Sequence, residues 1–109
     1  MARTHSPVTR DAVTVLGQLV ATERRTQRRT AADLAERAGI SRDTLYRVER
    51  GDPTVAVGTV LELLVLLGVP LFGEDAEGLA REAAAGRRLL TLLPERVRRS
   101  SPSEPDDDF

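Results

Sequence analysis

Apolar residues recur at intervals of three and four along the first part of the chain, a spacing typical of an amphipathic helix. Ser6 followed by Pro7 is a favourable helix start, because serine caps a helix and proline fits its first turn. We therefore expect a first helix from Pro7 to about Thr26. Its apolar positions are Ala12, Val13, Leu16, Leu19 and Val20.

Two short helices are expected next, with a glycine between them. Thr30 with Asp33 three residues later resembles a capping box, so the second helix begins there and ends at Gly39. Ser41 is placed to cap a third helix, which ends at Gly51. Two short helices joined by a turn of three or four residues are the pattern of a helix-turn-helix, whose second helix lies in the major groove of DNA.

The segment from Val57 to Leu67 is the most apolar part of the chain, and as a helix it carries leucine or valine on nearly every side. A core of this size cannot surround such a helix, so part of its surface is expected to contact another chain. A further helix is expected from Asp75 until Pro94. No alternation typical of strands is found, so the sequence predicts an all-α fold.

The third helix is expected to bury one face and to leave a basic, polar face uncovered. On a helical wheel at about 100° per residue, Leu45 and Val48 point inward. The side chains that point outward are Asp43, Tyr46, Arg47 and Arg50, with Arg42 and Thr44 beside them at the N-terminal end. Arginine on such a face can form bidentate hydrogen bonds with phosphate or guanine.

The formal net charge of −1 over 109 residues conceals blocks of opposite sign. Residues 1–50 contain ten arginines and six acidic residues, whereas residues 51–86 contain one arginine and six acidic residues. Residues 87–99 contain five arginines and one acidic residue, and the last ten residues contain four acidic residues and no arginine. The predicted helix-turn-helix thus lies in a basic block, which suits a phosphate-binding surface.

The stretch "TAADLAERAGISRDTLYRVERGDPTVAVGTVLELLVLLGV" resembles the Xre, or lambda-repressor-like, helix-turn-helix family over roughly residues 12–72. The residues in the family's places are Leu34, Ala35, Gly39, Ile40, Ser41, Leu45, Glu49 and Gly51. The resemblance implies a five-helix, lambda-repressor-like DNA-binding domain with a C-terminal helical extension and a flexible acidic tail. The expected parts are a flexible N-terminus (1–6), the helix-turn-helix domain (7–72), the C-terminal helix and basic extension (73–99) and a disordered acidic tail (100–109).

In the family that the chain resembles, side chains early in the third helix contact bases. The resemblance therefore implies four base-facing residues, Arg42, Asp43, Thr44 and Arg47. It places four others near phosphates, Ser41, Tyr46, Arg50 and Thr54. For Asp43 two interpretations stay open, because its carboxylate either accepts from a cytosine amino group or offsets the dipole at the start of its own helix.

Two further features matter in the resemblance to this family. Many members have glutamine at the start of the second helix, where it binds a phosphate, whereas this chain has Ala31. Thr30, or the arginines before it with Arg28 among them, are expected to take over that contact. The resemblance also implies a structural ion pair between Arg24 and Glu49, since a carboxylate that faced DNA would repel phosphate.

A second resemblance covers the C-terminal region. The run "GRRLLTLLPERVRR" and the terminal "DDDF" are similar to the C-terminal part of HipB-type antitoxins, small Xre proteins encoded beside a HipA-like kinase toxin. This resemblance implies a dimer that represses its own operon and holds the kinase inactive. The candidate partner-binding residues are Asp106, Asp107, Asp108 and Phe109, and a tail that only aids solubility is the alternative.

The sequence offers no basis for catalysis, for a metal site or for a cofactor. Cysteine is absent and His5 is the only histidine, so neither a histidine triad nor a metal cluster can be assembled. The glycines form neither a phosphate-binding loop nor a dinucleotide fingerprint. We therefore expect a protein that is not an enzyme, spans no membrane and resides in the cytoplasm.

These observations predict a sequence-specific repressor that binds an inverted-repeat operator in double-stranded DNA as a homodimer, and more specifically an antitoxin with a HipA-like partner. Two alternatives stay open. One is a repressor without a toxin partner, and the other is a protein-interaction module that no longer binds DNA. Ala31, Asp43 and the near-neutral net charge favour the interaction module.

Overall fold

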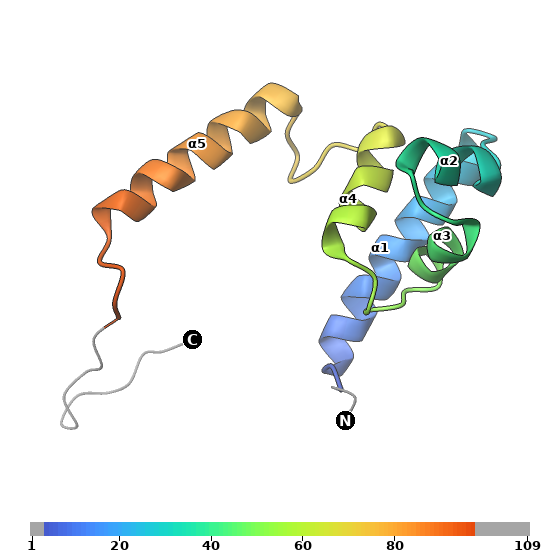
Figure 1. Cartoon of the computed structure of the whole chain (residues 1–109), viewed down its shortest axis with the longest axis horizontal. Coiled ribbons are helices and arrows are strands. Elements are labelled where there is room, and N and C mark those ends of the chain that lie inside the picture. The colour runs from blue at the N-terminus through green and yellow to red at the C-terminus, as the bar shows by residue number, and fades with distance from the viewer. Residues whose placement is uncertain (1–3, 98–109) are drawn as a thin grey trace. The chain divides into compact units, whose positions relative to one another are not determined.

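The computed structural model describes residues 4–97, and within them the chain forms five helices and no strand (Figure 1). The all-α prediction is therefore confirmed. The helices are α1 (Pro7–Thr26), α2 (Ala31–Ala38), α3 (Arg42–Glu49), α4 (Val57–Leu66) and α5 (Ala76–Leu92). Of the described residues, those up to Gly73 form one compact unit with four of the five helices, α1 to α4, and those from Glu74 form a second unit with α5.

Side chains that accept hydrogen bonds from the first turn set most of the helix starts. Four of them accept a bond from the backbone N–H three residues later: Ser6, Thr30, Ser41 and Asp75. Each cap satisfies a donor that the helix itself leaves unpaired, and the helix starts expected from the sequence are confirmed. Where the second bond of a capping box was expected, the carboxylate of Asp33 instead lies 3.3 Å from Arg37 Nε, one turn later in α2.

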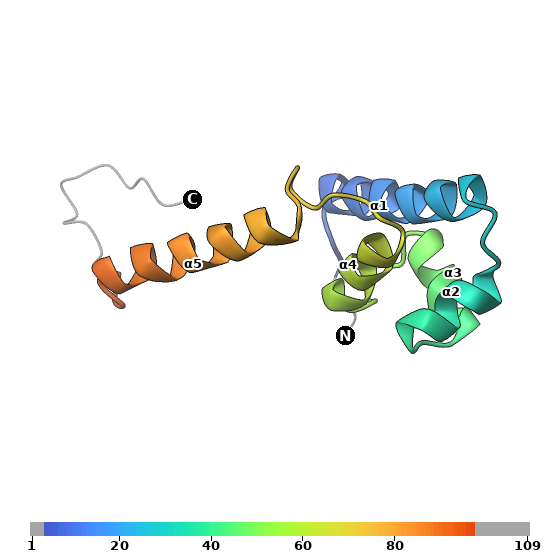
Figure 2. The same cartoon turned by 90° about the horizontal axis from the view of Figure 1, so that it is seen from above.

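The four helices of the first unit pack around one apolar core (Figure 2). α1 and α2 each contact both α3 and α4. The buried apolar residues are Val20, Ala31, Leu34, Ala35, Leu45, Val48, Leu63, Leu64 and Leu67. Because full burial of one large aliphatic side chain contributes about 1.5–3 kcal/mol, this core holds α3 firmly by its apolar face.

α1 and α3 come very close together at Gly17, which is buried in the middle of α1. A Cβ atom at this position would collide with the backbone carbonyl oxygen of Val48 and would lie 3.1 Å from the carbonyl oxygen of Glu49. The missing side chain therefore allows the two helix backbones to approach. It also fixes where the C-terminal end of α3 lies against α1.

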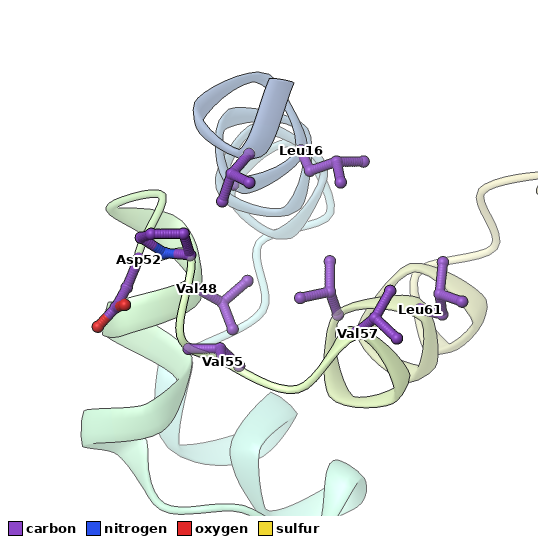
Figure 3. A pocket seen from close by; sticks show the side chains of 10 residues that line it. Leu16, Val48, Asp52, Val55, Val57 and Leu61 are labelled. Atoms are coloured by element: carbon purple, nitrogen blue, oxygen red, sulfur yellow. The ribbon is translucent and has the colours of Figure 1, made fainter. Parts of the chain in front are cut away.

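α4 leaves apolar side chains that the core of this unit does not cover. Val57 is 71% exposed and Val65 is 54% exposed. Beside Val57 lies a pocket of about 150 Å³, lined mainly by apolar side chains of α1, the end of α3, the loop after α3, and α4 (Figure 3). Incomplete burial of this helix was expected from its sequence and is confirmed, whereas its contact with another chain stays a prediction.

The second unit is built on α5, which begins after the Asp75 cap. Gly78 in its first turn is buried against the side chain of Glu74 of the same unit. The last turns of the helix carry large apolar side chains that are each more than half exposed, Leu89, Leu90, Leu92 and Leu93. These leucines are an uncovered apolar surface of the second unit.

Candidate nucleic-acid interface

α2 and α3 form the expected helix-turn-helix, with residues 39–41 as the turn between them. Gly39 ends α2 in the left-handed conformation, with φ 71°, and its backbone N–H donates to carbonyl oxygens of the last turn. Glycine adopts this conformation without the strain that a Cβ would impose. Ser41 Oγ then accepts from the backbone N–H of Thr44, at 3.0 Å, and starts α3. The turn is therefore tight and is held at both ends.

The apolar face of α3 lies against the core as the helical wheel predicts. Leu45 is fully buried and Val48 is 3% exposed. On the opposite side, Tyr46 is 43% exposed. Arg42 and Asp43 are exposed in the first turn of α3, and among the described residues neither side chain takes part in an ion pair. Their predicted contact with bases stays a prediction, for which these two side chains are sterically available.

Thr44 is less available, because its side chain takes part in the cap of its own helix. It is half-buried, and its hydroxyl oxygen accepts a hydrogen bond from Ser41 Oγ at 3.0 Å. The hydroxyls of Ser41 and Thr30, both predicted near phosphates, likewise accept backbone N–H groups at the starts of α3 and α2. Thr30 and Ser41 thus lie at the N-termini of α2 and α3, where the helix dipole favours an anion.

Arg47, predicted to face bases, is held by the loop that follows α3. Its Nε donates to Asp52 Oδ2 at 2.9 Å, and its Nη2 donates to the hydroxyl oxygen of Thr54 at 2.8 Å. Thr54 in turn donates to Asp52 Oδ1 through its hydroxyl at 2.7 Å and through its backbone N–H at 2.8 Å. Arg47, Asp52 and Thr54 therefore form a closed network, which we name the Arg47 clamp.

The charge of Asp52 is stabilised within the Arg47 clamp. Its pKa lies well below the ordinary value of 3.8, first because of the two hydrogen bonds from Thr54 and then because of Arg47. A lowered pKa means that the contribution of this carboxylate to stability is complete above its ordinary pKa and is lost as the pH falls below that value. The Arg47 clamp is thus intact at neutral pH.

The other residues predicted near phosphates are Tyr46, Arg50 and Arg28. Arg50 is exposed at the C-terminal cap of α3. Arg28 is exposed in the turn between α1 and α2. Its backbone has φ 59°, a conformation that residues other than glycine seldom adopt. Its guanidinium lies on the surface just before the start of α2. Contact of these residues with phosphate stays a prediction.

The expected partners Arg24 and Glu49 form an ion pair that joins α1 to the end of α3. Arg24 donates from Nε to Glu49 Oε2 at 2.7 Å and from Nη2 to Oε1 at 3.1 Å. The side chains are 11% and 7% exposed, so the pair is nearly buried. The hydrogen bond to Glu49 raises the pKa of Arg24 more than burial lowers it. The charges therefore serve the fold, and neither group faces the uncovered side of α3.

Sequence reasoning missed how the turn between α1 and α2 contacts α4. Gln27 Nε2 donates to the carbonyl oxygen of Leu67 at 2.7 Å, and Arg29 Nη1 donates to that of Leu66 at 3.0 Å. These bonds satisfy carbonyl groups that the end of α4 leaves unpaired. Arg29 is thus engaged in the fold, which leaves Arg28 as the more available neighbour for a phosphate. Sequence reasoning also missed Asp52, because this residue lies in the loop after α3 and the helical wheel covers only the helix.

The remaining candidate sites lie outside the helix-turn-helix. The tail residues predicted to bind a partner, Asp106 to Phe109, lie outside the described residues. Between residues 4 and 97, no group of three histidine or acidic side chains is arranged to hold a metal ion. In the same range, no helix has both the length and the apolar character needed to cross a membrane.

Comparison with known proteins agrees with the geometry of α2 and α3. A family model described as a helix-turn-helix domain matches residues 15–79, more than half of the chain. The match includes α2, α3 and the turn between them. No curated protein and no solved structure matches the chain. The tight turn and the uncovered face of α3 are the geometry expected of this motif. The family match therefore shows that the chain belongs to the helix-turn-helix domain family of DNA-binding regulators.

Proposed function

We propose that this protein is a transcriptional repressor that binds a specific inverted-repeat operator as a homodimer. The observation that carries the proposal is the seating of α3. Its apolar face is buried through Leu45 and Val48, whereas its other face carries Arg42 and Arg50 exposed to solvent. A helix held in this way can enter the major groove with its polar side chains forward.

We propose two kinds of DNA contact for the exposed arginines. Arg42, in the first turn of α3, is the proposed base reader, because a guanidinium can form a bidentate pair with guanine O6 and N7. Arg28 and Arg50, which lie at element ends, are suited to phosphates, where any sequence presents the same charge. Specificity then depends on α3, and much of the affinity depends on salt.

Arg42→Ala is expected to reduce the difference in binding free energy between operator and scrambled DNA by about 1–3 kcal/mol, because one base pair loses its bidentate partner. Arg28→Ala is expected to weaken both affinities alike and to lower the slope of log affinity against log salt by about one. The measurement is fluorescence anisotropy at two salt concentrations. The probes are a duplex selected by the wild-type protein from a random library and a scrambled duplex of the same composition.

The result of this comparison separates the proposed function from its alternative. Equal losses on both duplexes for Arg42→Ala would remove that residue from base recognition. Wild-type protein that binds both duplexes equally would favour a protein-interaction module, which the engagement of Arg47 with Asp52 and the exposed carboxylate of Asp43 support.

The homodimer of this proposal uses the uncovered side of α4. Two half-sites of an inverted repeat lie about 34 Å apart and need two copies of α3, so a second copy is the occupant that the function requires. The apolar side chains around the pocket, Val57 and Leu61 of α4 and Leu16 of α1, offer a surface on which it can pack (Figure 3). Leu16 is 37% exposed and Val57 is 71% exposed in the single chain.

Val57→Glu is expected to convert the dimer to a monomer, because dimerisation would bury the new carboxylate without a partner. Sedimentation velocity of the full chain measures this change. Ala32→Glu, at an exposed position of α2, adds the same charge and should leave the dimer intact. A chain that is monomeric before any substitution would contradict the homodimer.

We further propose that the repressor is an antitoxin that represses its own operon and inhibits a HipA-like kinase. The proposal is supported by the likeness of the C-terminal region to HipB-type antitoxins and by the exposed leucines of α5, which are available to a partner. A kinase-like gene beside this one would support the antitoxin, and its absence would favour a repressor without a toxin. DNA-binding regulation of this kind takes place in the cytoplasm.

A further inference from the structure

The Arg47 clamp uses only one edge of the Arg47 guanidinium. Nε and Nη2 lie on the same edge of this planar group, and they donate to Asp52 Oδ2 and to Thr54 Oγ1. Arginine has five N–H donors, so both hydrogens of Nη1 and one of Nη2 remain. Nη1 and Nη2 together form a second edge, which can make a second bidentate pair.

The acidic part of the clamp is itself held in place. Asp52 Oδ1 accepts two hydrogen bonds from Thr54, one from the backbone N–H and one from the hydroxyl. In Figure 3 the carboxylate of Asp52 points away from the apolar side chains that line the pocket. Two hydrogen bonds that do not involve Arg47 therefore orient the carboxylate, so the guanidinium has a defined binding position.

Two physical effects of Asp52 on DNA binding have opposite signs. As a negative charge near the recognition helix, the carboxylate repels phosphate, so its removal should strengthen binding to every sequence. As a seat for Arg47, it removes the rotational freedom of a long side chain before DNA binds, so its removal should weaken recognition of one base pair. The first effect changes affinity in general, whereas the second changes the ratio between sequences.

We propose that Asp52 is a positioning residue for base recognition: it holds the Nε edge of Arg47 so that the Nη1–Nη2 edge meets two acceptors of a base, such as O6 and N7 of guanine. The inference rests on the proposed DNA-binding function and deepens it. It assigns the specificity of α3 partly to a residue outside α3. It also gives Thr54, in the same loop, a role in orienting the clamp rather than in binding phosphate.

The test uses the full-length protein, the duplex selected by the wild-type chain and a scrambled duplex of equal composition. Asp52→Asn keeps the shape of the side chain and removes its charge. The one remaining oxygen is needed to accept from Thr54 N–H, so the amide NH2 takes the place of Oδ2 and cannot accept from Arg47 Nε. We expect the ratio of the two affinities to fall about tenfold, while affinity for the scrambled duplex stays level or rises. Glu36→Gln, at an exposed position of α2, removes the same charge and should leave the ratio unchanged.

A double-substitution cycle shows whether Asp52 acts through Arg47. In an Arg47→Ala background, Asp52→Asn should cause no further fall in the affinity ratio, because the side chain that it positions is gone. A merely structural role would lower the ratio equally in both backgrounds. Circular dichroism of each variant reports whether it is folded, and Thr54→Val, which leaves the carboxylate in place, is the second variant if Asp52→Asn unfolds.

Three outcomes overturn the inference. An unchanged or larger affinity ratio for Asp52→Asn would leave only the electrostatic effect of the carboxylate. An equal fall in the Arg47→Ala background would make Asp52 a structural residue. In both cases the proposed DNA-binding function would stand, whereas wild-type protein that binds both duplexes equally would overturn that function and the inference with it.

Discussion

Glu49→Ala is expected to lower the free energy of unfolding of the first unit by about 3–5 kcal/mol. The substitution leaves the guanidinium of Arg24, only 11% exposed, without the carboxylate that accepts two of its hydrogen bonds. A buried charge without a partner costs more than the pair itself contributes. The expected loss is a large part of the 5–15 kcal/mol typical of a whole domain, and urea unfolding followed by circular dichroism measures it.

Two further variants show whether burial causes this loss. Arg37→Ala breaks the exposed pair with Asp33, whose side chains are 60% and 47% exposed, and should cost less than about 0.5 kcal/mol. Arg24→Met combined with Glu49→Leu removes both charges and should regain most of the loss, because no unpaired charge stays buried. Recovery is not expected to be complete, since Arg24 Nη1 also donates to the carbonyl oxygen of Arg29 at 3.1 Å. Similar losses from Glu49→Ala and Arg37→Ala would contradict the importance of burial.

The consequence for DNA binding differs from that of a base-contacting residue. Glu49 lies at the end of α3, and its bond to Arg24 fixes that end against α1. Glu49→Ala should therefore lower binding to specific and scrambled duplexes alike, in proportion to the fraction of unfolded protein. A selective loss on the specific duplex would instead indicate that the carboxylate shapes the recognition face directly.

The helix starts could be predicted from the sequence because each depends on a few neighbouring residues. Ser6, Thr30 and Ser41 each cap through a bond to the N–H three residues later, so the pattern is contained within four positions. The buried face of α3 was equally predictable, since the helical period fixes which side Leu45 and Val48 occupy. The all-α fold follows from such local rules.

The interactions that shape the candidate site join residues far apart in the sequence or depend on the path of a loop. The wheel places Arg47 outward, but its engagement with Asp52 depends on the path of the loop between α3 and α4, which has no period. The bonds from Gln27 and Arg29 to the end of α4 join residues 40 and 37 positions apart. No spacing rule relates positions so distant, and the pairing of Arg24 with Glu49 was expected only through resemblance to a family.

Gly17→Ala is the other substitution with a large expected effect, a loss of about 3 kcal/mol in the free energy of unfolding. The added Cβ would collide with the carbonyl oxygen of Val48 and would lie 3.1 Å from Gly51 N, so α1 and α3 must move apart. These are backbone atoms, which cannot turn aside as the end of a flexible side chain can. Thermal unfolding measures the change, and a loss of this size in a unit of this length lowers Tm by on the order of 15 °C.

Gly58→Ala is the matched control, because it makes the same replacement in α4 at a position where a new Cβ meets nothing within 4 Å. Alanine favours a helix over glycine by up to about 1 kcal/mol, so this variant should be slightly more stable than the wild type. The same propensity acts at Gly17, where the collision must exceed it for stability to fall. If Gly17→Ala also stabilises the protein, α1 and α3 can separate without cost, and the close approach does not fix the position of α3.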